Sequence, residues 1–409
     1  MKPRLLYLTH RLPYPPDKGD RIRNYHVLRQ LSRVARVWLA ALADEPVTQE
    51  QRSALESLCE RVAIVPVSPR LRKISAALSA IRGRSLTEGA FHEPAFDAVL
   101  RDWGKETSWH AALVSASSLG PYLKRNGLDR LPRFVDLVDV DSQKWFDFAA
   151  AARWPKTLLY RFEANRVRKL ERNIATWARG IFLVSKHEAA VFDGFTKPGP
   201  RRQDAGAGEP KAATVATNGV DLDYFHPMPE VAEQPACAFV GAMDYFPNID
   251  GAIWFANDIW PAIRARRPDA EFWIIGRKPT PEVLALGKLP GVKVTGSVPD
   301  VRPHVAAAML AVAPIRVARG LQNKVLEAMA MGKPTLAAPA AIAALKVEPG
   351  RHLLCPRSTD EWVAAVCDLL DSPERRTSLG HAGRQFVETE HHWDRCLQPM
   401  IDAMALCHN

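Results

Sequence analysis

Residues 315–335 read Ile315-Arg-Val-Ala-Arg-Gly-Leu-Gln-Asn-Lys-Val-Leu-Glu-Ala-Met-Ala-Met-Gly-Lys-Pro-Thr335. The apolar run 309–314 before them is typical of a buried strand, and Gly320 allows the backbone to approach a ligand closely. A strand, a glycine-bearing loop and a helix start in this order predict an anion site, because the unpaired N–H groups and the dipole at a helix N-terminus both favour phosphate. The stretch therefore predicts a phosphate-binding α/β unit.

The helix expected in this stretch covers 324–331, with Asn323 as its N-cap and Gly332 as its left-handed end. Lys324 adds a mobile positive charge at the anion site. Glu327, one turn further on, is short enough to accept hydrogen bonds from a pair of sugar hydroxyls. We therefore expect a nucleotide-linked sugar here, with its pyrophosphate on the amides and Lys324 and its ribose on Glu327. An ordinary helix with a solvent-facing lysine and glutamate is the alternative.

The composition indicates a globular chain of two domains. Its 409 residues exceed the size of one ordinary core, and a content of 47% apolar and 24% charged residues excludes a disordered chain. No apolar run reaches the length of a membrane-spanning helix, and the N-terminal hydrophobic run is too short for a signal peptide. The six cysteines show no Cys-x-x-Cys spacing, so neither a zinc site nor a disulfide framework is expected. We expect a reduced, cytoplasmic protein.

The positive charge calls for an anionic partner. The formal net charge is +10 and the isoelectric point is about 9.4. Nucleic acid is not the expected partner, because the chain has no zinc finger and no RNA-reading aromatic motif. Anionic lipid and pyrophosphate-bearing substrates both fit the charge.

Short apolar strands alternate with helical segments along the chain. In the first half, strands are predicted at Arg4–Thr9, Ala35–Leu42, Val62–Val67, Ala112–Ser117, Arg133–Val138, Gly180–Val184 and Thr214–Thr217. In the second half, Gly241, Gly276 and Gly296 end further predicted strands. The pattern predicts an α/β fold of two Rossmann-like, doubly wound domains. No G-x-G-x-x-G is present, so a nicotinamide or flavin cofactor is not expected.

The domains are expected at 1–220 and 221–392, with a C-terminal helix over 393–409 that crosses back to the first domain. Residues 194–212 are rich in glycine, proline and charge without periodicity, and they predict a mobile surface loop.

Two aspartates follow the strand predicted at 133–138. Asp139 and Asp141 lie where the carboxyl ends of parallel strands bind ligands, so they are candidates for positioning an acceptor hydroxyl. Helix capping is the alternative. A metal site is not expected, because no partner ligands accompany these aspartates.

Residues 70–84 predict a basic amphipathic helix. Leu71, Ile74, Leu78 and Ile81 share one face, and no acidic residue occurs between Arg61 and Thr87. A helix of this kind suits reversible contact with an anionic membrane surface. A helix that packs its apolar face on the core is the alternative.

The run from Gly320 through Lys324 and Glu327 to Pro334 resembles the donor-binding signature of family 4 retaining glycosyltransferases. With Tyr245-Phe-Pro-Asn248, it is similar to a subgroup, the exosortase-associated glycosyltransferases of bacterial exopolysaccharide clusters. The resemblance implies a GT-B fold, in which two domains face a central cleft, with the donor on the second domain and the acceptor on the first. It also implies a nucleotide diphosphate sugar as co-substrate, no metal requirement, and peripheral association with the inner face of the cytoplasmic membrane.

The residues and the resemblance together give an expected site. The catalytic residues are expected to be Lys324, Arg316 and Asp139. The donor-binding residues are expected to be Gly19, Gly241, Asn248, Gly276, Arg277, Val298, Arg319, Gly320, Leu321, Gln322, Asn323 and Glu327. Arg277 and Val298 are carried over as backbone contacts beside the nucleotide base.

Two positions depart from the family pattern. Arg319 stands where relatives place a second glutamate, which ordinarily contacts the transferred sugar. Gly241-Ala242 replaces the usual Gly-Arg, so Arg316, Arg319 and Lys324 are the candidates for charge on the pyrophosphate.

The expected function is retaining transfer of a hexose-type sugar from a nucleotide diphosphate donor to a glycan or lipid-linked acceptor in exopolysaccharide or cell-surface polysaccharide synthesis. A nucleotide-sugar epimerase on the same fold and a non-catalytic nucleotide-sugar-binding scaffold are the alternatives.

Overall fold

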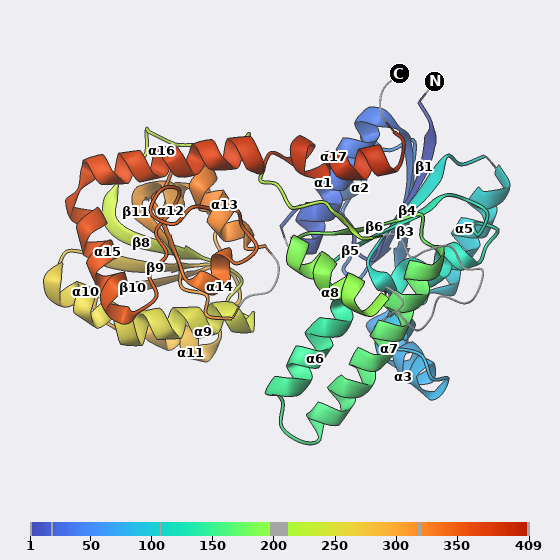
Figure 1. Cartoon of the computed structure of the whole chain (residues 1–409), viewed down its shortest axis with the longest axis horizontal. Coiled ribbons are helices and arrows are strands. Elements are labelled where there is room, and N and C mark those ends of the chain that lie inside the picture. The colour runs from blue at the N-terminus through green and yellow to red at the C-terminus, as the bar shows by residue number, and fades with distance from the viewer. Residues whose placement is uncertain (1, 18, 107, 197–211, 318–320, 407–409) are drawn as a thin grey trace. The chain divides into compact units, whose positions relative to one another are not determined.

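The computed structural model describes residues 2–17, 19–106, 108–196, 212–317 and 321–406 (Figure 1). The chain divides into two compact units, Met1–Thr217 with Leu397–Asn409, and Asn218–Cys396. We call them the N-terminal and the C-terminal domain and describe each by itself. The predicted loop over 194–212 falls largely outside the described residues.

In the described part of the N-terminal domain the strands form a parallel sheet of seven, in the order β3-β2-β1-β4-β5-β6-β7. The strands are β1 (Arg4–Thr9), β2 (Arg36–Ala43), β3 (Arg61–Pro66), β4 (Ala111–Ser115), β5 (Arg133–Val138), β6 (Gly180–Leu183) and β7 (Thr214–Val215). The helices are α1 (Gly19–Val34), α2 (Gln49–Glu56), α3 (Pro69–Ile81), α4 (Leu86–Ala90), α5 (Pro94–Glu106), the 3-10 helix η1 (Ser117–Lys124), α6 (Asp141–Ala151), α7 (Lys156–Trp177) and α8 (Lys186–Thr196).

The C-terminal domain has a parallel sheet of five strands among its described residues, in the order β10-β9-β8-β11-β12. The strands are β8 (Gln234–Val240), β9 (Glu271–Ile275), β10 (Val292–Gly296), β11 (Ala308–Ala313) and β12 (Thr335–Ala337). The helices are α9 (Phe246–Trp254), the π-helix η2 (Phe255–Ile259), α10 (Trp260–Arg266), α11 (Pro281–Leu286), α12 (Arg302–Ala307), α13 (Asn323–Ala330), α14 (Pro339–Ile342), α15 (Thr359–Asp371) and α16 (Pro373–Glu390). The last helix, α17 (Trp393–Ala403), belongs to the N-terminal domain from Leu397 onward. Figure 1 shows α12, α13 and α16 on one face of this sheet and α9, α10 and α11 on the other.

Both sheets form because their strands are apolar without alternation. Five of the six residues of β1 and seven of the eight of β2 are buried, as expected for parallel strands that helices cover on both faces. The predicted strands are confirmed, and Arg4–Thr9 and Arg133–Val138 have the predicted bounds. The predicted α/β class with two parallel, doubly wound sheets is therefore confirmed.

The core-packing alternative for residues 70–84 is wrong. Ile74, Leu78 and Ile81 of α3 are 56%, 46% and 82% exposed. The side chain of Leu71 lies outside the described part of the helix. The apolar face that the sequence predicts therefore exists, and the domain does not bury it.

Candidate functional site

The strand order of each domain predicts where a ligand would bind. In the C-terminal domain the chain starts at β8, runs outward to β10 and returns to β11 on the other side of β8. In doubly wound sheets ligands bind outside the carboxyl ends of the strands at this reversal. The loops that follow β8 and β11 carry Gly241, Leu321 and Gln322, and the helices α9 and α13 that follow these loops carry Asn248, Asn323 and Glu327.

Two glycines allow the ends of neighbouring strands to approach each other. Gly276 after β9 has φ +151°, and a Cβ on it would lie 1.7 Å from the carbonyl oxygen of Gly241. A Cβ on Gly241 would lie 2.7 Å from Nδ2 of Asn248. A side chain at Gly276 would therefore collide with the backbone of Gly241, and one at Gly241 would displace the side chain of Asn248.

Lys324 connects the two loops at the reversal. Its Nζ donates hydrogen bonds to Oδ1 of Asn248, at 3.0 Å, and to Oε1 of Gln322, at 3.3 Å. Asn248 is buried in the first turn of α9, and its Nδ2 donates to the carbonyl oxygen of Ala242 at 2.9 Å. The lysine predicted to be mobile is thus held in place by two amide side chains.

Lys324 and Glu327 perturb each other's titration. Burial lowers the pKa of Lys324 to about 8, although the nearby Glu327 carboxylate opposes the shift. Burial raises the pKa of Glu327 to about 7, and Lys324 partly offsets that rise. A cation and a carboxyl group that both titrate near neutral pH are typical of functional sites.

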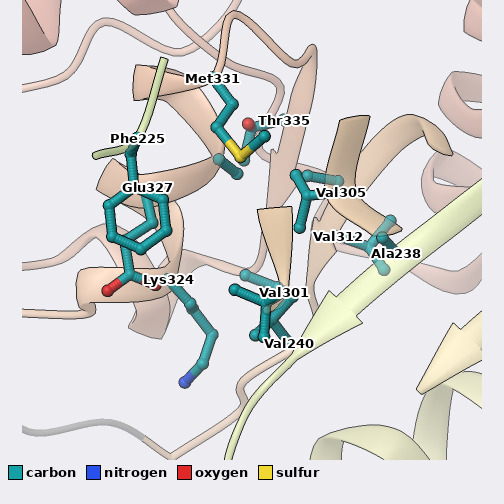
Figure 2. Close-up of a pocket in the computed structure, with 13 residues that line it drawn as sticks. Phe225, Ala238, Val240, Val301, Val305, Val312, Lys324, Glu327, Met331 and Thr335 are labelled. Carbon is teal, nitrogen blue, oxygen red and sulfur yellow. The ribbon is translucent and has the colours of Figure 1, made fainter. Parts of the chain in front are cut away.

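A small cavity opens beside these two side chains (Figure 2). Strands β8, β11 and β12 and helices α12 and α13 surround it, and Phe225 covers part of it. Its lining is Phe225, Ala238, Val240, Val301, Val305, Ala311, Val312, Ala313, Lys324, Glu327, Ala328, Met331 and Thr335. Lys324 and Glu327 supply the charged groups of this otherwise mostly apolar lining.

The helix start differs from the prediction by one residue. Asn323 is the first residue of α13 and Gln322 is the N-cap, without a side-chain capping bond. The expectation that Asn323 caps the helix is therefore wrong, and its Oδ1 instead accepts a bond of 3.5 Å from Nδ2 of Asn218. Gly332 adopts the predicted left-handed conformation, with φ +67°.

Arg316 lies on the surface beside α9. Its Nε donates to Oδ2 of Asp250 at 3.0 Å, its guanidinium also bonds Oδ1, and its Cζ lies 5.3 Å from the centre of the Trp254 ring. The side chain is about half exposed. Asp250 and Trp254, both in α9, thus hold the side chain of Arg316, a predicted catalytic residue, against that helix.

The remaining predicted donor residues contact the frame of the domain. The carbonyl oxygen of Arg277 accepts a bond from the amide of Met243, and Val298 and Leu321 pack against the core. Arg319 and Gly320 lie outside the described residues.

The N-terminal domain carries Gly19 and Asp139. Gly19 is the first residue of α1. Asp139 follows β5, and burial, with Glu188 and Asp141 nearby, raises its pKa to about 6. Its Oδ1 is buried without a hydrogen-bond partner among the described residues. Asp141 accepts a bond from the hydroxyl of Ser117 at 3.1 Å.

Two strained residues flank this aspartate pair. Ala116 after β4 and Val138 at the end of β5 have φ values of +78° and +67°. Positive φ is rare for alanine and strained for a β-branched valine, and such strain gathers at functional sites. β4 is the strand at which this sheet reverses beside β1, so the crevice of the N-terminal domain is expected beside these residues.

The N-terminal domain also contains a buried ion pair that sequence patterns do not reveal. Arg23 of α1 and Asp136 of β5 are both fully buried, and two hydrogen bonds of 2.7 and 2.9 Å join them. Arg23 also donates to the carbonyl oxygen of Ala216 at 2.9 Å. The signal for this pair would be that Arg23 is buried, and burial cannot be read from the sequence.

The chain is similar to known proteins both in sequence and in fold. Residues 234–372 match the family model of group 1 glycosyl transferases. That range includes the loops after β8 and β11, Lys324 and Glu327.

A curated relative and several solved structures resemble the chain. The relative is the GDP-mannose-dependent monoacylated alpha-(1-6)-phosphatidylinositol monomannoside mannosyltransferase of Corynebacterium glutamicum, which is 34% identical over 146 residues. The match covers 33% of this chain and spans only 38% of the relative. Sucrose-phosphate synthase from Thermosynechococcus elongatus has a TM-score of 0.68 at 15% identity, with 98% of both chains covered. Anabaena Alr3699/HepE, solved in complex with UDP and glucose, has a TM-score of 0.68 at 14% identity, covering 99% of this chain and 100% of its own. The fold is that of the GT-B glycosyltransferases.

The described residues contain neither a membrane-spanning helix nor a cluster of metal ligands. None of the helices in the described ranges combines the length and the apolar character needed to cross a bilayer. In the same ranges, no three histidine, cysteine, aspartate or glutamate side chains gather as a metal site.

Proposed function

We propose that the chain is a retaining glycosyltransferase. It moves a hexose-type sugar from a nucleotide diphosphate sugar to a glycan or lipid-linked acceptor in bacterial exopolysaccharide or cell-surface polysaccharide synthesis. The observation that carries the proposal is the bond between Lys324 and Asn248 at the reversal of the C-terminal sheet, with Glu327 one turn further along α13. Lys324 and Glu327 lie in the segment that matches the group 1 glycosyl transferases.

The donor side of the reaction belongs to the C-terminal domain. When the bond between the anomeric carbon and the diphosphate breaks, negative charge builds on the departing oxygen. The ammonium group of Lys324 and the first amides of α13 favour that charge, and a preorganised cation costs little reorganisation. Glu327, when ionised, accepts bonds from the ribose hydroxyls. Arg316 is the second candidate for a cation on the diphosphate.

The acceptor side is assigned to the N-terminal domain. The hydroxyl oxygen of the acceptor bonds to the anomeric carbon as the diphosphate leaves from the same face, and the hydroxyl proton passes to the departing phosphate oxygen. Asp139 orients that hydroxyl, since its Oδ1 lacks a hydrogen-bond partner among the described residues. No metal is required in this scheme.

The relatives indicate which donors to test first. The Corynebacterium relative is GDP-mannose-dependent, and the Anabaena structure holds UDP and glucose. We expect one nucleotide sugar from a panel of uridine and guanosine diphosphate sugars to bind and to be consumed in the presence of an acceptor. Mass spectrometry of the released nucleoside diphosphate and NMR of the new anomeric linkage measure this. A free sugar isomer formed without acceptor would indicate an epimerase, and binding without turnover would indicate a scaffold.

Membrane contact through residues 70–84 is the second part of the proposal. The exposed apolar face of α3 and its exposed basic residues, Arg70, Lys73, Arg82 and Arg84, support it. A lipid-linked acceptor would then reach an enzyme held reversibly on the inner face of the cytoplasmic membrane. Nucleic acid has no place in this proposal.

Donor binding should depend on pH in both directions. Lys324 loses its positive charge as the pH rises through about 8, so affinity for the diphosphate falls above that value. Glu327 is ionised only above about pH 7, so its bonds to ribose weaken below that value. Calorimetric titration with UDP-glucose or GDP-mannose should therefore show the highest affinity between these two values.

Two arginine variants test the origin of the alkaline limb. Arginine remains charged well above pH 8, so Lys324→Arg should extend binding to higher pH. Lys346→Arg, at an exposed position of the same domain, should leave the profile unchanged. An affinity that stays constant from pH 6 to about 9 would contradict the assignment of both groups.

A further inference from the structure

A second exposed apolar surface lies on the N-terminal domain. Among its described residues, every exposed large hydrophobic side chain belongs either to α3 or to the hairpin formed by α6 and α7. On the hairpin, Phe148, Trp154, Leu158 and Leu159 are 44%, 79%, 60% and 51% exposed. Single exposed apolar residues are normal in proteins, but a cluster of this size marks an interaction surface.

The hairpin holds this cluster in a defined shape. Trp145, Phe148 and Tyr160 contact one another on the part of the hairpin nearer its turn, with ring centres 5.6 to 6.2 Å apart. In the turn, the hydroxyl of Thr157 donates to the carbonyl oxygen of Ala152 at 2.7 Å. Trp154 therefore stands on an ordered turn, at the point where the chain passes from α6 to α7.

The hairpin and α3 belong to one structural unit. Oε1 of Glu163 accepts the amide of Thr87 and Oε2 that of Leu86, and Arg166 donates to the carbonyl oxygen of Gly83 at 2.6 Å. These hydrogen bonds attach the start of α4 and the segment after α3 to α7, about two helical turns from the hairpin tip. Figure 1 shows α6 and α7 projecting from the sheet, with α3 beside α7.

The charge around the tip is predominantly positive. Lys144, Arg153, Lys156 and Arg161 are exposed, and Asp147 is the single acidic residue in 142–162. Tryptophan with leucines inside a ring of basic side chains is the composition that lies in the interface of an anionic bilayer, where the rings sit at headgroup level and the cations meet lipid phosphates.

We propose that the α6–α7 tip, residues 148–161, is a membrane-inserting wedge that binds an anionic lipid surface together with α3. It extends the proposed membrane contact of 70–84 to a second element and does not depend on the transferase chemistry. Charge complementarity selects lipid over a second copy of the chain, because two copies meeting at these tips would bring like charges together.

Flotation of the full chain with vesicles tests the wedge. The vesicles contain phosphatidylcholine alone or with about one third phosphatidylglycerol, which gives the surface a negative potential. Wild-type protein should float with the anionic vesicles only. Trp154→Ser should lower the partition coefficient about tenfold, and each basic residue removed in Arg153→Ser or Lys156→Ser should lower it about fivefold.

Matched controls separate the wedge from a general loss of hydrophobicity or charge. Leu284→Ser and Lys288→Ser change exposed residues of the C-terminal domain and should bind as the wild type does. Brominated lipid should quench more tryptophan emission in the wild type than in Trp154→Phe. Equal flotation of Trp154→Ser and wild type would overturn the proposal. A dimer in analytical ultracentrifugation that Trp154→Ser dissociates, with no lipid binding, would assign the surface to self-association instead.

Discussion

Lys324→Ala should lower kcat/KM for sugar transfer by on the order of a thousandfold. The reason is that the side chain lies at the reversal of the sheet, where Asn248 and Gln322 hold its ammonium group. An interaction made with charge that develops only as the diphosphate departs affects kcat, and not only donor affinity. Rates of nucleoside diphosphate release at saturating and at limiting donor separate the two effects.

The controls for this variant lie in the same domain. Lys346→Ala removes an exposed lysine that is not part of α13 and should leave the rate unchanged. Lys324→Arg keeps the charge but cannot reproduce the compact ammonium contact to both amides, so it should recover only part of the rate. An unchanged rate in Lys324→Ala would mean that another cation, with Arg316 as the first candidate, carries the diphosphate.

Asp136→Ala should destabilise the N-terminal domain by about 3–5 kcal/mol. The variant leaves Arg23 charged, fully buried and without the carboxylate that now accepts two of its hydrogen bonds. The cost of an unpaired buried charge is large because the protein interior solvates it poorly. Urea denaturation, followed by circular dichroism, should show the transition of this domain at a lower midpoint.

Two comparisons test the cause of that loss. Glu106→Ala breaks the ion pair with Arg61, in which both side chains are nearly half exposed, and it should cost about 0–1 kcal/mol. The double variant Arg23→Met with Asp136→Leu removes both charges and should recover most of the lost stability. If the double variant is as unstable as Asp136→Ala, the loss comes from packing and not from the unpaired charge.

Short-range sequence patterns set the individual strands and helix ends. The non-alternating apolar runs that form β1 and β5 are typical of parallel strands covered on both faces, so their bounds can be predicted without any knowledge of their neighbours. Gly332 ends α13 because its own backbone conformation requires glycine. These features depend on residues a few positions apart.

The partners of the charged and apolar side chains, in contrast, depend on how distant segments pack together. Arg316 pairs with Asp250 and Arg23 with Asp136, partners 66 and 113 residues apart in the chain. The apolar face of α3 has the same spacing whether it is buried or exposed, and only the fold shows that the domain leaves it uncovered. Burial and pairing arise from contacts between segments that are distant in the chain. The order of the strands in each sheet sets those contacts, and no local sequence pattern specifies that order.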